Sequence, residues 1–289
     1  MDGFSSRATA AVVLSIALVG VSFGSIFVRL ADAEPLAIAV WRMTLAAGLV
    51  SLPAWLVSAP RHPGLRPLCA AAAAGGLLAL HFATWISSLQ FTTVANSVLL
   101  VNTAPVFLVA LLWLAGKRPA AGTLAGVGLA ALGALILGFP SLDDAGTLLG
   151  NLLALAGAVS MAGYLLLARE AQRSLGYLTF VSSAWCSAAA VLWIAVLAGK
   201  VQWSGFDGQT WWMFAGLALV SQVIGHGGYN WSLRVLPPAV VAIALTGEPV
   251  VASLFAWLLL DEVPGAATLA GGALVMAAIL LVVRSERDA

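Results

Sequence analysis

Ten apolar segments follow one another along this chain, and each is long enough to cross a lipid bilayer. A hydrocarbon core of roughly 30 Å requires about 20 mostly apolar residues in one helix. Charged residues, prolines and glycines divide the chain into segments near residues 8–30, 35–57, 68–89, 94–115, 120–139, 147–168, 176–198, 210–232, 238–260 and 265–284. With 62% hydrophobic and 9% charged residues, so much apolar surface cannot be buried inside one water-soluble globule. The segments therefore predict an all-α integral membrane protein of ten transmembrane helices.

The connections between the segments are too short to hold a soluble domain. The first segment follows Arg7, as the core of a signal peptide would, but its apolar stretch is longer than such a core usually is. We expect it to be retained as a helix. Cys69 and Cys186 stand inside apolar stretches without metal-ligand spacing, so both are interpreted as packing residues.

Basic residues collect in alternate connections, and their placement predicts the orientation. Cytoplasmic loops of membrane proteins carry an excess of lysine and arginine. With a cytoplasmic N-terminus, two of the thirteen basic residues lie outside, Arg29 and Lys200, and one lies within a segment, Arg42. The other ten lie inside: Arg7, Arg61, Arg66, Lys117, Arg118, Arg169, Arg173, Arg234, Arg284 and Arg287. Both termini are therefore predicted to be cytoplasmic (N-in, C-in).

The two halves of the chain repeat one another. When the sequence is shifted by 144 residues, residues 85–114 align with residues 229–258. The aligned pairs include Ser88/Ser232, Pro105/Pro249 and Trp113/Trp257. Each half contains five segments, an odd number, so the second half must insert in the opposite orientation. We expect two inverted five-helix repeats, residues 1–144 and 145–289, as in many transporters.

Several short motifs resemble the drug/metabolite transporter superfamily with paired EamA-type halves. They are Trp41-Arg42-Met43, Ala104-Pro105-Val106, Glu248-Pro249-Val250, and Asp261-Glu262 followed by Leu269-Ala270-Gly271-Gly272. The chain departs from the pattern at Lys117-Arg118, where many members carry an acidic residue. The resemblance implies ten helices, a central cavity between the halves and export across a bacterial inner (cytoplasmic) membrane. Length and aromatic content are also similar to the YddG-type amino-acid exporters.

Glu248 is the first candidate for the transport chemistry. It lies about ten residues into its segment, near the bilayer midplane, where an ionised carboxylate is costly unless it is paired or hydrated. It serves either as a coupling or substrate-amine site, or as a carboxylate that is protonated or bound to neighbouring helix groups. Pro249 follows it, and Pro105 holds the matching place in the first half. Each proline leaves a carbonyl four residues earlier without its helical donor, so these interruptions are candidate substrate contacts or simple kinks.

Arg42 lies seven residues into its segment from the outer side, roughly 10 Å deep at the helical rise per residue. Its guanidinium is a candidate anchor for an anion or a partner for Glu248. The alternative is a structural arginine bonded to helix ends and interfacial water. Because the resemblance places an arginine here in transporters of many substrates, the structural role is favoured.

Two histidines occupy nearly matching places in the repeats. His81 and His226 each share a helix face with an aromatic residue, Trp85 and Tyr229 respectively. We interpret the four side chains as the lining of a cavity that stacks an apolar ligand. Proton coupling through either histidine is the alternative, although a neutral imidazole bonded to a backbone carbonyl is commoner. No carboxylate stands at ligand spacing, so no metal site is expected.

The remaining candidates are aromatic or small polar residues deep inside the segments. Most tryptophans fall near segment ends, where aromatic belts form without further function. The candidate substrate-binding set is Ser22, Trp41, Arg42, His81, Trp85, Asn102, Tyr164, Trp185, His226, Tyr229, Thr246 and Glu248. Asn102 and Thr246 are equivalents in the two repeats. For Ser22, bonding within its own helix or close contact with another helix is the favoured interpretation.

These features predict a secondary transporter that exports small metabolites by alternating access. Hydrophobic or aromatic amino acids are the favoured substrates, and broad efflux of lipophilic cations is the alternative. No phosphate-binding loop, catalytic triad or HExxH motif is present, so no enzyme and no cofactor are expected, and an intramembrane enzyme is a remote alternative. No basic cluster suits nucleic acid. The expected partners are the lipid bilayer and a small-molecule substrate, with a monomer as the expected state.

Overall fold

A computed structural model describes residues 2–57, 64–116, 121–138, 145–172, 174–232 and 247–288. These residues are helical apart from turns and short connections, and no strand occurs among them. Six of the helical stretches are long and apolar enough to cross a membrane: Val12–Leu30, Pro35–Ala54, Leu65–Ser88, Val94–Leu114, Gly146–Ala168 and Tyr177–Ala198. The all-α fold predicted from the sequence is confirmed.

Helices of the first half coincide with the first five predicted segments. Their bounds are α1 (Asp2–Ser22), α2 (Gly24–Leu30), α3 (Pro35–Val57), α4 (Leu65–Ser88), α5 (Val94–Val101), α6 (Ala104–Leu114) and α7 (Ala121–Gly138). α1 and α2 together form the first predicted segment, and α5 and α6 form the fourth. Their apolar length explains the helical state, because a helix satisfies every backbone polar group of its interior without help from solvent.

Helices of the second half are α8 (Ala145–Gln172), α9 (Tyr177–Ala198), α10 (Gly208–Gly216), η2 (Leu217–His226), α11 (Gly227–Ser232), α13 (Glu248–Leu260) and α14 (Ala266–Asp288). α10, η2 and α11 follow one another in the predicted eighth segment. In the predicted ninth segment, residues 238–246 lie outside the described part of the chain, and α13 covers the rest. Asp207 caps the start of α10, and its Oδ1 accepts a bond from the Thr210 amide at 2.8 Å. The bonds from Thr210 lower the pKa of Asp207.

Among the described residues, the fourth and eighth segments depart from regular α-helix near their centres. The fourth is interrupted between Val101 and Ala104, because Pro105 has no N–H to continue the hydrogen-bond ladder. The interruption predicted at this proline is therefore present. The eighth changes to π-helix over η2, where hydrogen bonds span five residues instead of four. π-Helical turns are often found at functional sites.

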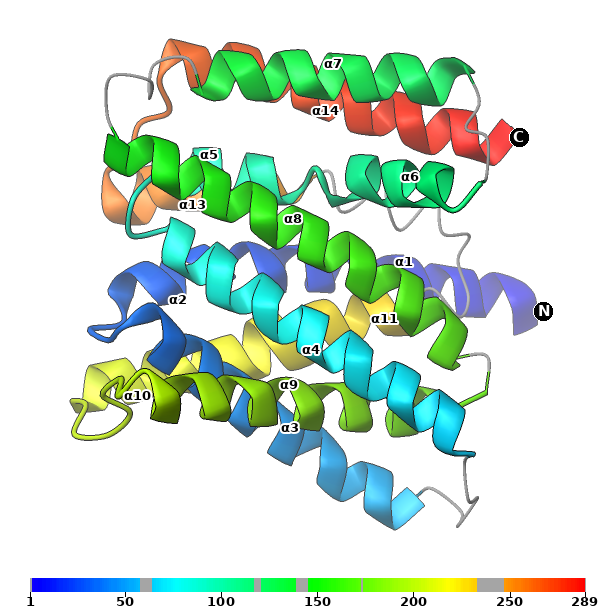
Figure 1. The fold of residues 1–289 in the computed structure, drawn as a ribbon, viewed down its shortest axis with the longest axis vertical. Helices are drawn as coiled ribbons and strands as arrows, with labels where there is room; N and C mark the ends of the chain where they lie inside the picture. The colour runs from blue at the N-terminus through cyan, green and yellow to red at the C-terminus, as the bar shows by residue number, and fades with distance from the viewer. Residues whose placement is uncertain are drawn as a thin grey trace.

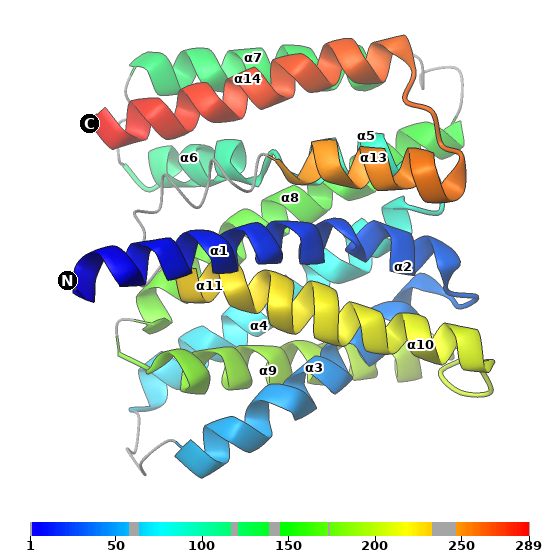
Figure 2. The same cartoon turned by 180° about the vertical axis from the view of Figure 1, so that it is seen from behind.

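The helices run side by side, with α7 and α14 along one edge of the molecule and α3, α9 and α10 along the opposite edge (Figures 1 and 2). Between these edges, α4 packs against α8 and α9, while α1 packs against η2 and α11. The N- and C-termini lie at the same end of the helices. We call this the terminal end. The opposite end, where α2, the α4–α5 turn and the α13–α14 connection meet, is called the Glu262 end.

Close packing of α4 on α9 depends on Gly75. A Cβ atom at this position would clash with the Ala184 carbonyl. It would also lie 2.7 Å from the Ser187 Cβ and 3.0 Å from the Ala188 amide. The next residue, Gly76, has no atom within 4 Å of the same position. Gly75 therefore lies in a tight contact with α9, whereas Gly76 faces open space.

This contrast predicts opposite effects of the same substitution. Gly75→Ala should push α9 away from α4 and lower the melting temperature of the purified protein. Gly76→Ala should leave it unchanged or raise it, because alanine favours a helix interior by about 0.5–1 kcal/mol over glycine. Thermal unfolding in detergent measures both. Equal melting temperatures for the two variants would contradict the packing of α4 against α9.

Candidate functional site

Arg42 projects from α3 into the centre of the molecule and is 1% exposed. Its Nε and Nη2 atoms donate to the Oε1 atom of Gln222 in η2, at 3.0 and 2.8 Å. Gln222 is fully buried as well. The pair joins residues 180 positions apart in the chain, so a bidentate bond ties α3 to the π-helical segment.

An aromatic side chain lies beneath the guanidinium. The Cζ atom of Arg42 stands 3.9 Å from the ring centre of Phe82 and 5.7 Å from that of Trp85, both on α4. Such contacts are attractive because the face of an aromatic ring is electron-rich. The edge of His226 meets the same Phe82 ring, with centroids 5.7 Å apart. α3, α4 and η2 therefore converge on Phe82, which is completely buried.

His81 directly precedes Phe82 on α4 and also belongs to this group of side chains. Its Nδ1 atom lies 2.9 Å from the carbonyl oxygen of Gly157 in α8, and its ring stacks on Trp85 with centroids 6.2 Å apart. Because a carbonyl can only accept, Nδ1 must carry a proton. This is the backbone-bonded histidine considered in the sequence analysis. We refer to Arg42, His81, Phe82, Trp85, Gln222 and His226 as the Arg42 cluster.

Glu248 begins α13 and contacts the interruption of the fourth segment. Its Oε2 atom accepts a bond of 3.4 Å from Nδ2 of Asn102, which caps the end of α5 and also donates to the Val98 carbonyl at 2.9 Å. A carboxylate in the first turn of a helix is stabilised by the exposed amides there. Arg42 and Glu248 form no ion pair, so the direct partnership considered from the sequence is absent.

Two of the sequence candidates lie in other surroundings. Trp41 donates from Nε1 to the Trp203 carbonyl at 2.8 Å, and its ring meets the edges of Trp193 and Trp211. It thus belongs to a separate aromatic cluster. Ser22 donates to the Leu18 carbonyl at 2.8 Å, the bond within its own helix that the sequence favoured.

Three aromatic candidates lie around α11. Tyr164 of α8 is hydrogen-bonded to Asn230 and lies near Phe180, with ring centroids 6.4 Å apart. Trp185 of α9 is 1% exposed, and its ring edge lies 3.9 Å from the point that a Cβ on Gly227 would occupy. Tyr229 packs in a cluster with Leu14, Ala17 and Val21 of α1. Thr246 lies outside the described residues.

Sequence reasoning missed Phe82 and Gln222. Phe82 follows His81 directly, and the 144-residue shift places it on His226, which it touches. That coincidence was a usable signal, because equivalent positions of two repeats can meet at the axis that relates them. Gln222 gave no such signal. Its contact with Arg42 follows only from the packing of α3 against η2.

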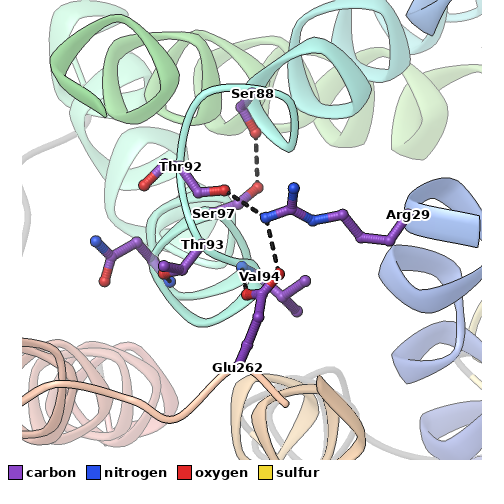
Figure 3. A network of polar contacts seen from close by, with 8 residues as sticks. Arg29, Ser88, Thr92, Thr93, Val94, Ser97 and Glu262 are labelled. Atoms are coloured by element: carbon purple, nitrogen blue, oxygen red, sulfur yellow. Dashed lines mark hydrogen bonds and ion pairs between the residues drawn. The ribbon is translucent and has the colours of Figure 1, made fainter. Parts of the chain in front are cut away.

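A second polar network closes the Glu262 end (Figure 3). Arg29, at the end of α2, places Nη2 2.9 Å from Oε1 of Glu262 and 2.9 Å from the Thr92 carbonyl oxygen. The other carboxylate oxygen of Glu262 accepts from the Val94 amide at 2.8 Å. One carboxylate therefore joins α2, the start of α5 and the connection between α13 and α14.

Local structure holds Glu262 in place. Asp261 ends α13 in the left-handed conformation at φ 57°, which turns the chain so that the Glu262 amide bonds to the Ala256 carbonyl at 3.2 Å. Opposite it, Thr93 caps α5 by accepting from the Asn96 amide. Asp261-Glu262 was recognised in the sequence as part of a motif, and this network was not predicted.

Comparison with known proteins places the chain among transporters. The model of the EamA-like transporter family matches it twice, over residues 8–139 and 148–284. A protein of Archaeoglobus fulgidus described as an uncharacterized transporter is 27% identical over 277 residues, which cover 94% of each chain. A solved crystal structure is similar with a TM-score of 0.65 at 19% identity, over 97% of this chain and 99% of that one. The structural likeness concerns the fold alone.

Proposed function

This chain belongs to the EamA-like transporter family and is a multi-pass membrane protein, and from that premise we propose that it exports small metabolites, amino acids above all, by alternating access. The proposed location is a bacterial inner membrane, with both termini in the cytoplasm. One observation carries the proposal. Side chains from the two halves meet in a partly buried polar centre, where Asn102 contacts Glu248 and Phe82 contacts His226.

The packing of the helices supports two inverted repeats. The 144-residue shift exchanges α1 with α8, α3 with α9, and α4 with the α10–η2–α11 segment. If the halves are related by a two-fold axis, the contact of α4 with α8 requires one of η2 with α1, and the contact of α4 with α9 requires one of η2 with α3. Both are present. The two matches of the family model, residues 8–139 and 148–284, agree with the proposed units 1–144 and 145–289.

The surroundings of the centre favour amino acids. Glu248 offers an anionic group to an amine, and the aromatic rings of the Arg42 cluster offer a surface for an apolar side chain. The Glu262 end would be the outer face in the proposed orientation. The Arg29–Glu262 network then closes the outer side of the pathway and must open for release.

The orientation predicts which connections can be labelled from outside. Cys69 and Cys186, both exposed, are first replaced by serine, and single cysteines are placed at Asp143, Asp207 and Lys117. A membrane-impermeant thiol reagent should label the first two positions in intact cells and leave the third unlabelled until the membrane is opened. Labelling at Lys117 together with protection at Asp143 would reverse the proposed orientation.

Transport is measured with purified protein in liposomes. Hydrophobic and aromatic amino acids should move down their gradients, unchanged chemically, at rates above those of empty liposomes. The comparison includes lipophilic cations of similar size. Movement of the cations without the amino acids would establish drug efflux instead, and chemical conversion of the solute would indicate an enzyme.

Glu248 is expected to serve the transport cycle more than assembly. Glu248→Gln keeps the acceptor that faces Asn102 and removes the negative charge, so the protein should fold with a melting temperature close to the parent but lose most flux. Glu34→Gln, the same change at an exposed position between α2 and α3, is the control. Parental flux of Glu248→Gln from pH 5 to pH 8 would show that the carboxylate is only a packing partner.

A further inference from the structure

Three hydrogen-bond donors of the Arg42 cluster have no acceptor. They are Nη1 of Arg42, Nε2 of Gln222 and Nε1 of Trp85, each with no partner among the described residues and each on a side chain at least 95% buried. A buried donor without an acceptor loses the hydrogen bonds it would make with water, so such groups are rare unless a ligand uses them. All three groups are donors, which indicates that the missing partner is an acceptor.

The geometry of the Arg42–Gln222 pair shows which edge of the guanidinium is open. Arginine can only donate, so Gln222 must turn its oxygen toward Arg42, and its N–H groups then face elsewhere. Nε and one N–H of Nη2 are used on that side. The edge formed by Nη1 and the second N–H of Nη2 remains free, and this edge matches the two oxygens of a carboxylate.

Neighbouring aromatic rings fix this edge in space. Phe82 covers one face of the guanidinium at 3.9 Å, and Trp85 lies 5.7 Å away, so the side chain cannot swing freely. Trp85 and Ser221 both come within 3.4 Å of the point where a Cβ on Gly24 would lie, and the Ser221 hydroxyl is also buried without a partner. Side chains that carry open polar groups thus lie side by side where α2, α3, α4 and η2 pack together.

Charge leads to the same conclusion. A buried guanidinium needs an anion, because removing it from water without one is costly. The ten apolar segments contain one acidic residue, Glu248, whose Oε2 is turned to Asn102. The described ion pair, Arg29–Glu262, lies at the Glu262 end. Glu248 interacts with Arg42 through space but forms no ion pair with it, so the guanidinium lacks an anion in direct contact, and a bound anion would supply one.

We propose that Arg42, Gln222 and Trp85 form the subsite for the carboxylate of the transported solute. The solute class is then an apolar carboxylate, with or without an amine, and lipophilic cations are disfavoured. The inference rests on the proposed transport function and extends it by naming the recognised group. It also gives Arg42 the anion-binding role that the sequence analysis placed second to a structural one.

The test compares ligands that share one ring and differ in their charged groups. Phenylalanine, 3-phenylpropionate and phenethylamine are titrated into the purified protein in detergent, and thermal unfolding is followed. A ligand that binds the folded state raises its melting temperature according to its concentration and affinity. The two carboxylates should bind about tenfold or more tightly than the amine, as expected when a charge-assisted bond is lost.

Gln222→Glu separates recognition from folding. It keeps an oxygen that accepts from Arg42, but it neutralises the guanidinium and replaces the free N–H groups of Gln222 by an anionic oxygen. The variant should fold, and both carboxylates should bind about tenfold or more weakly. Gln202→Glu makes the same charge change on an exposed connection and should bind like the parent. Trp85→Phe removes one donor, keeps a ring and should also weaken both carboxylates, which provides a reading independent of Gln222.

Three results would overturn the subsite: phenethylamine binding as tightly as phenylalanine, unchanged carboxylate affinity in Gln222→Glu and Trp85→Phe, or no stabilisation by any carboxylate at millimolar concentration. Inorganic phosphate or chloride stabilising as strongly as 3-phenylpropionate would also overturn it, in favour of a simple anion site. Failure of transport is distinguishable. Carboxylates that bind in this pattern but do not cross proteoliposomes contradict the transport function alone, whereas amino-acid flux that is unchanged in Gln222→Glu and Trp85→Phe contradicts the subsite alone.

Discussion

Lipid offers no hydrogen bonds, and this constraint determines where the backbone of this protein can depart from a helix. Inside a bilayer each backbone N–H and C=O must find a partner within the protein. The fourth segment leaves α-geometry at Asn102 and Thr103, where Asn102 donates its own side chain back to the Val98 carbonyl. The eighth segment becomes π-helical without losing its hydrogen-bonded ladder. Both departures lie on helices that contribute side chains to the polar centre.

The same apolar surroundings explain why each charged group in the segments has an elaborate set of neighbours. Arg42 is bonded to an amide oxygen and covered by an aromatic face, while Glu248 meets an amide and begins a helix. Neutral partners of this kind hold a charge without cancelling it. In a permanent ion pair, the charges of Arg42 and Glu248 would largely cancel. Because they do not form such a pair, each can attract an oppositely charged group of a solute.

The sequence predicted the type and many of the limits of the described helices well, because each depends on a run of apolar residues and on local interruption. The predicted segment 176–198 corresponds to Tyr177–Ala198, and Pro105 marked a break through its missing N–H. Contacts between residues that lie far apart in the sequence were harder to predict. Nothing near Arg42 indicates Gln222, since their bond depends on how α3 packs against η2. Trp41 and Trp85 looked equivalent by depth, yet Trp41 turns to Trp203 and Trp85 to Arg42.

Unlike the central charges, the ion pair between Arg29 and Glu262 is partly exposed to solvent. The two side chains are 28% and 23% exposed, so dissolved ions can approach them, whereas Arg42 is shielded from the medium. At physiological ionic strength, fields between exposed charges fade over roughly 8 Å, and concentrated salt shortens this range further. Salinity would therefore loosen the contact at the Glu262 end while leaving the centre untouched, which makes the electrolyte that bathes this end a direct influence on how readily the end separates.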